Sequence, residues 1–281
     1  MATYRYLRIG IVVAVFVLIA GLIVERVEAG CLKSSISAYF YSPVRSLLVG
    51  ALVAIGLCLV AIRGRTDSEE VLLNLAGMFA PIVALVPTPP SRDDCPSPVA
   101  TDPASTDAAP LPEWVTALID NNVVAYFVVA GLVVVALIVW WAAVGRWRRT
   151  ASWFLRSVLI YTGLVLAGSI GYLTSDKFKE YAHWLAAVAM FVCFFGVVVG
   201  SARRWRTDAP AYAAAYRAVW RAMILAAVAI GGWKLLDDHA GGFPTWDEEI
   251  YWLEIAEIFL FALFWGIQTW QFRADDPAAP R

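Results

Sequence analysis

The stretch Ser34-Ser-Ile-Ser-Ala-Tyr-Phe-Tyr-Ser-Pro-Val-Arg45 lies between two long apolar segments, residues 7–24 and 44–62. Serine and tyrosine side chains are dense within it, whereas the flanking segments are predominantly apolar. We expect this stretch not to be exposed to lipid, because the bilayer core offers polar groups no hydrogen-bond partners. It therefore reads as a polar connection between two membrane helices, and apolar segments alternate with polar connections through the rest of the chain.

The composition is typical of a protein built for a lipid environment. Of the 281 residues, 60% are hydrophobic and 16% are charged, whereas soluble domains carry about 25% charged residues. The net charge of −1 gives no reason to expect a nucleic-acid partner. Only two histidines are present, which excludes a three-histidine zinc site within one chain, and no Gly-rich phosphate loop occurs. We expect membrane lipids as partners, and no cofactor or metal.

A membrane-spanning helix needs about 20 predominantly apolar residues. We predict eight such spans, at residues 7–24, 44–62, 71–87, 123–145, 152–173, 181–200, 212–235 and 249–270. The expected fold class is an all-α bundle of about eight transmembrane helices, with residues 1–281 forming a single transmembrane domain. A cleaved signal peptide is the alternative for the first span, since Arg5 and Arg8 stand at its start. Charged residues between its apolar run and Cys31 favour a retained helix.

The charges of the connections predict the orientation. Arginine is concentrated in the connections that face one side, above all in the clusters Arg146–Arg149 and Arg203–Arg206. Because cytoplasmic loops carry an excess of Lys and Arg, we place both clusters and both termini in the cytoplasm. The protein is then expected to be a multi-pass protein of the cell membrane, with Ser34–Arg45 on the outer side.

One connection is long and rich in proline. Residues 88–122 form the predicted extracytoplasmic loop, in which seven prolines precede residue 113. Such a composition favours an extended linker over a packed element. The loop carries Cys95, and Cys31 is expected on the same side, so a disulfide and two unpaired thiols are both open. Cys58 and Cys193 lie within spans, where we expect small packing residues.

Small residues recur at a spacing of four, as in Gly196-Val-Val-Val-Gly200. This pattern lets membrane helices approach each other closely. We expect these faces to pack within the molecule, and an oligomer interface is the alternative.

The residues that could carry chemistry gather in the expected outer half of the bundle. The candidate polar pocket comprises Ser35, Ser37, Tyr39, Tyr41, Arg45, His183, Glu254 and Glu257. Glu254 and Glu257 share one face of the eighth span, because they are three residues apart. Glu257 is expected about 10 Å inside the bilayer, where a charge costs at least about 2.5 kcal/mol, so it needs a partner. A buried polar clamp that fixes helix register is the alternative to a ligand-binding or proton-handling pocket.

Several of these motifs resemble those of a family of polytopic membrane proteins. Ser35-Ile-Ser-Ala followed by Arg45 is similar to the first outer loop of a broad group that includes the FGF-receptor-activating protein, autophagy modulators and GPI-anchor lipid-remodelling factors. Bacterial membrane proteins of unknown function resemble the chain more closely. The further matching motifs are Asn74-Leu-Ala-Gly77, Ala84-Leu-Val-Pro-Thr88, His183 with Ala186 and Ala187, Tyr216-Arg217, and Glu257 with Phe264.

The resemblance implies that this chain contains an inserted helix pair, and it implies a general class of function. The similar proteins run from the end of the third helix almost directly to the histidine-bearing helix, so residues 123–175 are expected to be an inserted helix pair at the periphery. The eukaryotic members imply lipid handling and membrane organisation.

Three functions remain open from the sequence. We favour a non-enzymatic lipid-binding, lipid-regulating or accessory membrane protein with an outer-facing polar pocket. The first alternative is an intramembrane lipid hydrolase or acyl-remodelling enzyme that uses Ser35 or Ser37, His183 and Glu257 as nucleophile, base and orienting group. The second alternative is a proton-coupled transporter built around His183 and Glu257. Whether the protein is an enzyme is left open by the residues alone.

Overall fold

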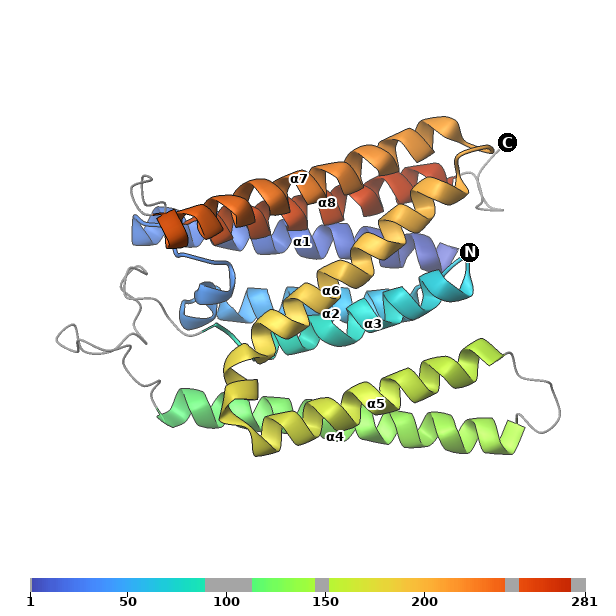
Figure 1. The fold of residues 1–281 in the computed structure, drawn as a ribbon, viewed down its shortest axis with the longest axis horizontal. Coiled ribbons are helices and arrows are strands. Elements are labelled where there is room, and N and C mark those ends of the chain that lie inside the picture. Colours follow the sequence, from blue (N-terminus) through green and yellow to red (C-terminus); the bar gives the residue numbers. More distant parts are fainter. Residues whose placement is uncertain (1, 89–112, 145–151, 241–247, 274–281) are drawn as a thin grey trace.

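The computed structural model describes residues 2–88, 113–144, 152–240 and 248–273, and the regular secondary structure of these residues is entirely helical (Figure 1). In chain order the elements are α1 (Ala2–Ala29), the 3₁₀ helix η1 (Ser37–Tyr41), α2 (Arg45–Ala61), α3 (Asp67–Leu85), α4 (Glu113–Val144), α5 (Ser152–Thr174), α6 (Asp176–Arg204), α7 (Pro210–Ala240) and α8 (Glu249–Gln271).

Six of these helices, α1, α3, α4, α6, α7 and α8, are long and apolar enough to cross a membrane. The chain is therefore a multi-pass membrane protein. The apolar helix Arg45–Ala61 (α2) and the apolar segment Leu159–Thr174 of α5 are shorter. The all-α fold class is confirmed by these helices.

Several helices extend beyond the predicted spans, among them α1 and α4. α1 runs on to Ala29, because the charged residues after its apolar run continue the helix. α4 begins at Glu113, inside the segment 88–122 that was predicted to be a loop. Proline is poorly tolerated inside a helix, and Pro112 is the last proline before a segment with good helix formers. Residues 89–112, with the prolines themselves, lie outside the described residues.

Six helices form a closed ring. Each of them packs against the next in the order α1, α2, α3, α6, α7, α8, and α8 returns to α1. α4 and α5 pack against each other and contact the ring chiefly through α3 and α6, so this hairpin lies at the periphery (Figure 1). That the hairpin is an insertion stays a prediction.

Aromatic rings fill the space between α6, α7 and α8. Phe194 lies with its ring centroid 4.6 Å from that of Phe261 and 5.3 Å from that of Phe264. Tyr216 lies 5.3 Å from Phe264 on the other side, and Trp265 is 1% exposed. Edge-to-face and tilted arrangements of this kind contribute beyond the area that they bury. They hold the three helices that border the candidate site.

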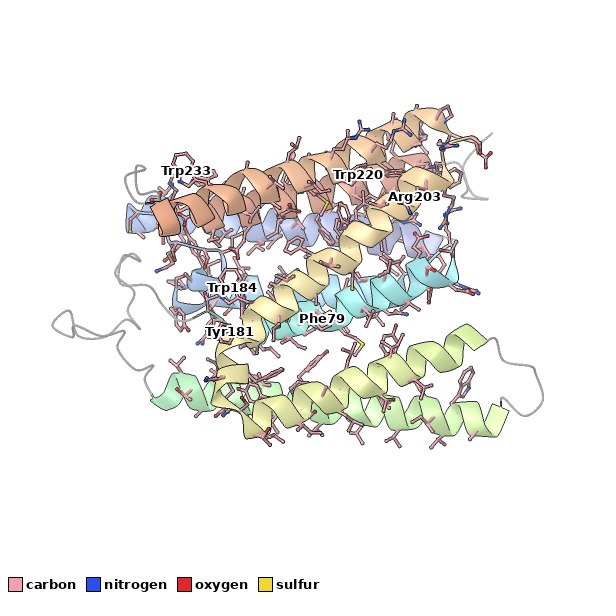
Figure 2. All side chains as sticks on the ribbon, in the orientation of Figure 1. Phe79, Tyr181, Trp184, Arg203, Trp220 and Trp233 are labelled. Carbon is pink, nitrogen blue, oxygen red and sulfur yellow. The ribbon has the colours of Figure 1, made fainter. Side chains whose placement is uncertain are left out.

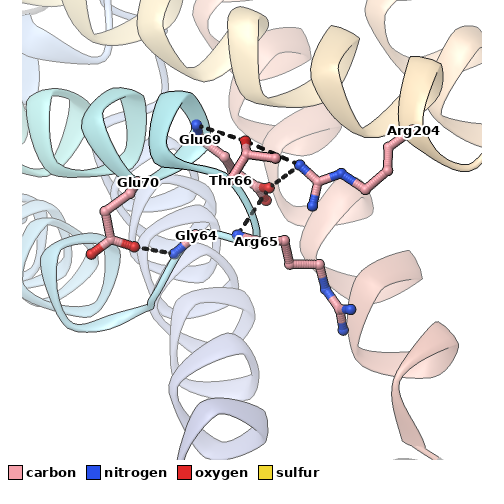
Figure 3. Close-up of polar contacts among 6 residues, drawn as sticks. All are labelled: Gly64, Arg65, Thr66, Glu69, Glu70 and Arg204. Atoms are coloured by element: carbon pink, nitrogen blue, oxygen red, sulfur yellow. Dashed lines mark hydrogen bonds and ion pairs between the residues drawn. The ribbon is translucent and has the colours of Figure 1, made fainter. Parts of the chain in front are cut away.

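A polar cluster ties the turn between α2 and α3 to the end of α6 (Figure 3). Thr66 caps α3 by accepting a hydrogen bond from the Glu69 amide at 3.2 Å. The Glu69 carboxylate accepts one from the Arg204 guanidinium at 2.7 Å. In the same turn, the Arg65 guanidinium lies 3.7 Å from the ring centroid of Phe272, just after α8. The end of the bundle opposite η1 is therefore joined across α3, α6 and α8.

α2 and α3 approach each other most closely at two glycines. A Cβ atom on Gly56 would lie 2.7 Å from the Gly77 carbonyl oxygen, and one on Gly77 would lie 2.6 Å from the Gly56 carbonyl oxygen. Real Cβ atoms do not approach backbone oxygens so closely, so only glycine fits on both sides of this crossing. Gly196 of the predicted small-residue motif faces Leu72 of α3, and so contributes to packing within the molecule.

We predict that Gly56→Ala lowers the melting temperature of the detergent-solubilised protein, because the added methyl group forces α2 and α3 apart at a cost of about 1–3 kcal/mol. Gly50→Ala is the matched control, since a Cβ at Gly50 of the same helix meets nothing within 4 Å. Both changes carry the same gain in helix propensity. A melting temperature that falls equally in both variants would contradict this account of the crossing.

Candidate functional site

The polar stretch Ser34–Arg45 folds inward at one end of the bundle, where it forms η1. We call this the η1 end. Ser35, Ser37, Tyr39 and Tyr41 are all buried. Ser35 starts the turn by accepting a hydrogen bond from the Ala38 amide at 3.1 Å. The stretch is therefore a plug inserted among the helix ends and not an open loop.

The end of α3 holds one side of this plug. The Ser37 hydroxyl oxygen accepts a hydrogen bond from the Thr88 amide at 3.0 Å, and the Tyr41 hydroxyl donates to the Thr88 carbonyl at 3.0 Å. His183 of α6, which is 2% exposed, donates from Nδ1 to the Val86 carbonyl at 2.6 Å. Nδ1 must carry the proton, because a carbonyl oxygen can only accept. α6 and η1 are thus both fastened to the segment Val86–Thr88.

The beginning of α8 holds the other side. The Glu254 carboxylate accepts a hydrogen bond from the Ile36 amide at 2.6 Å, and the Tyr251 amide donates to the Ser34 carbonyl at 3.0 Å. Charge-assisted bonds of this length are among the stronger hydrogen bonds in proteins. Three elements distant in sequence, α3, α6 and α8, therefore converge on the plug.

Two predicted pocket residues have packing roles. The Arg45 guanidinium lies 5.6 Å from the ring centroid of Phe40, and it forms no ion pair with the acidic residues that the structure describes. Tyr39 is fully buried beside Tyr251, with ring centroids 6.1 Å apart. Burial raises the pKa of Tyr39 to about 12, so its phenol stays protonated at neutral pH. Neither residue is placed for proton transfer.

A groove of about 300 Å³ lies beside the plug, between α6, α7 and α8. Its lining residues are Trp184, Ala187, Val188, Phe191, Val192, Phe195, Met223, Ile224, Ala227, Ile250, Leu253, Glu254 and Glu257. All except the two glutamates are apolar. Val188 is 59% and Val192 is 62% exposed, so the groove opens on the side of the bundle that faces lipid. Trp184 marks its η1 end, near Tyr181 (Figure 2).

Glu257 is the unusual member of this lining. Its side chain is 8% exposed, and its Oε2 atom has no hydrogen-bond partner among the described residues. It lies about 12 Å along α8 from Glu249, within a helix that is long and apolar enough to cross a membrane. An ionised carboxylate at this depth requires a cation or a hydrogen-bond donor, and a protonated one still requires a partner for its hydroxyl. Because Glu257 lines the groove, a molecule bound there can supply this partner.

Two further cavities separate the α4–α5 hairpin from the ring. One, of about 320 Å³, has apolar walls contributed by α3, α4, α5 and α6. The other, of about 510 Å³, also borders α2 and includes Glu70, Asn74 and Tyr161. The Tyr126 hydroxyl spans the gap by donating to the Met78 carbonyl at 2.6 Å. The hairpin is therefore less extensively packed against the ring than the ring helices are against one another.

The structure brings some of the predicted residues together and leaves others apart. Ser37 and Tyr41 join His183 through the segment Val86–Thr88, and Glu254 joins the plug through Ile36. No hydrogen bond among the described residues links His183 to Glu257, or either of them to a serine of the plug. A nucleophile and its base are expected within about 2.6–3.2 Å of each other, so the described contacts lend no support to a serine hydrolase.

Among the described residues, no group of three or more His, Cys, Asp or Glu side chains is arranged to hold a metal ion. Cys58 and Cys193 are free thiols. Cys31 is disulfide-bonded. Its predicted partner Cys95 lies outside the described residues, so the pairing stays a prediction.

The sequence analysis named the motif that contains Val86–Thr88 but gave this segment no role in the site, and it missed the apolar walls of the groove. A signal for the first was present, because Pro87 ends α3 and leaves nearby backbone groups without helical partners. The groove had no such signal, because its walls resemble any lipid-facing surface.

We predict that Ser37→Ala loosens the plug, because the buried Thr88 amide loses its acceptor at a cost of about 1–3 kcal/mol. Hydrogen exchange should become faster at the Thr88 amide and across residues 34–45. Ser46→Ala is the control, since Ser46 is exposed near the start of α2. Unchanged exchange at Thr88 in the Ser37 variant would show that this hydrogen bond does not hold the plug.

Comparisons of the chain with protein-family models, with curated proteins and with solved structures returned no match. The resemblance drawn from the sequence motifs therefore stays a prediction.

Proposed function

We propose that the protein is a non-enzymatic lipid-binding membrane protein with a lipid-regulating or accessory role, and that the groove between α6, α7 and α8 holds a lipid chain. The observation that carries the proposal is the position of Glu257: a buried carboxylate with an unpartnered oxygen among the described residues, on the wall of an apolar groove open to lipid. Apolar walls with a few placed polar groups are the usual character of small-molecule sites.

The two alternatives are less well supported by the same contacts. A hydrolase would need Ser35 or Ser37 beside a base, yet each of these hydroxyls accepts a backbone hydrogen bond and His183 is bound to Val86. A proton-coupled transporter would need a chain of polar groups leading away from Glu257. Apart from Glu254, the walls of the groove are apolar.

We further propose that all eight helices span the cell membrane with the η1 end outside. The support is the charge at the two ends: the connections at the opposite end carry Arg63, Arg65, Arg203, Arg204 and Arg206. α1 begins and α8 ends at that same end (Figure 1). For the function itself, the resemblance to proteins of lipid remodelling supports the proposed lipid-binding role.

We predict that Ala227→Trp, which fills the groove from α7, lowers the amount of lipid that copurifies with the protein by at least severalfold. Ala229→Trp is the matched control, because Ala229 is also an exposed alanine of α7 and does not line the groove. Mass spectrometry of the extracted lipids measures the effect. Equal lipid content in the wild type and both variants would contradict binding in the groove.

We predict that reporters or single cysteines at Thr106 and Ala274 are accessible from opposite sides of the membrane, with Ala274 cytoplasmic. Both positions lie outside the described residues, and the expectation follows from the loop charges alone. Labelling of both positions from one side would overturn the proposed topology.

A further inference from the structure

The groove contains two carboxylates on its α8 wall, and its other lining residues are apolar. Glu254 and Glu257 lie on one face of α8, one turn apart, and Ile250 and Leu253 line the groove between them and the η1 end. Glu254 already accepts the Ile36 amide, whereas Oε2 of Glu257 accepts nothing from the described residues. Further from the η1 end, Val192 and Phe195 of α6 continue the apolar wall. A ligand that fits must therefore combine a polar group with an apolar body.

The two glutamates decide which charge the polar group of the ligand should carry. Neither of them forms an ion pair with the basic side chains in the described ranges. A carboxylate is acceptor-only when ionised, so its best partner is a cation that also donates hydrogen bonds. A primary ammonium has three N–H donors, whereas a quaternary ammonium has none and brings methyl groups to the carboxylates. The pair therefore favours a primary amine over a choline-type headgroup.

The size of the groove limits the apolar part of the ligand. A volume of about 300 Å³ is at the lower limit for ligand pockets, which are about 300–1,000 Å³. One acyl or alkyl chain suits it better than the body of a two-chain lipid. A hydrated metal ion does not suit it, because beyond the carboxylates the walls offer no oxygen or nitrogen ligands.

We infer that the groove binds an amphiphile whose primary ammonium contacts Glu257 and Glu254 and whose single chain lies along α6 towards Phe195. This inference rests on the proposed function, because it names the headgroup chemistry of the ligand in that groove. Two sources share the chemistry: the ethanolamine headgroup of a membrane phospholipid, with one of its chains inserted, and a free long-chain amine.

The first experiment compares two probes that differ only in their N–H donors. Purified full-length protein is titrated with hexadecylamine and with hexadecyltrimethylammonium, and bound probe is counted by native mass spectrometry. We expect the wild type to bind the amine at least tenfold more tightly than the quaternary probe. Glu257→Gln, which keeps the side-chain volume, should reduce amine binding at least tenfold and leave quaternary binding unchanged. Glu28→Gln, at the exposed end of α1, is the control.

A second arm identifies the source. Nanodiscs of phosphatidylcholine are compared with nanodiscs in which phosphatidylethanolamine of the same chains replaces part of it. Retention of phosphatidylethanolamine by the wild type but not by Glu257→Gln assigns the ligand to the membrane phospholipid. Amine binding without this retention assigns it to a free single-chain amine.

The outcomes separate this inference from the proposed function. Equal affinity of the wild type for both probes overturns the ammonium assignment, and this comparison needs no variant to fold. If Ala227→Trp still reduces copurified lipid in that case, lipid binding in the groove stands with another headgroup. If neither probe binds and Ala227→Trp has no effect, both the inference and the proposed function fail.

Discussion

The backbone of Ser34–Arg45 has to be hydrogen-bonded inside the bundle, because it leaves the α-helical pattern next to a hydrocarbon medium that offers no partners. Residues near the ends of other helices supply the hydrogen-bond partners. The Ile36 amide donates to the Glu254 carboxylate and the Ser34 carbonyl accepts from the Tyr251 amide, both in the first turns of α8. The side chains of Ser37 and Tyr41 bond to the amide and carbonyl of Thr88, in the segment after α3. The arrangement of helix ends at the η1 end therefore follows from the need to hydrogen-bond one short stretch of the chain.

The same requirement decides what the candidate site can do. His183 is engaged by the Val86 carbonyl and the hydroxyls of Ser35 and Ser37 by backbone amides, so these contacts fasten the plug and α6 in place. Glu254 takes part in the plug and also lines the groove, which joins the two. Glu257, one turn further along α8, has a carboxylate oxygen with no hydrogen-bond partner among the described residues. The chemistry available to a ligand is therefore concentrated at one carboxylate, with a second as neighbour.

The ring explains how such a groove persists in a packed bundle. Phe194, Phe261, Phe264 and Trp265 fill the centre, and the glycines of α2 and α3 let those helices meet closely. α6 and α7 still leave space at their lipid-facing side because the residues there, such as Ala187 and Ala227, are small. Lipid can occupy such a space without the cost that water would incur in an apolar cavity.

The sequence by itself determined that this is an all-helical membrane protein, because long apolar runs separated by polar connections leave no other solution in lipid. It also singled out Ser37, His183, Glu254 and Glu257, since polar residues are costly at such positions. Only the tertiary structure decided that His183 and Ser37 meet through Val86–Thr88 and that Glu257 faces a groove. Those contacts join residues more than fifty positions apart, and helical periodicity reports which residues share a face of one helix, not which helix packs against that face.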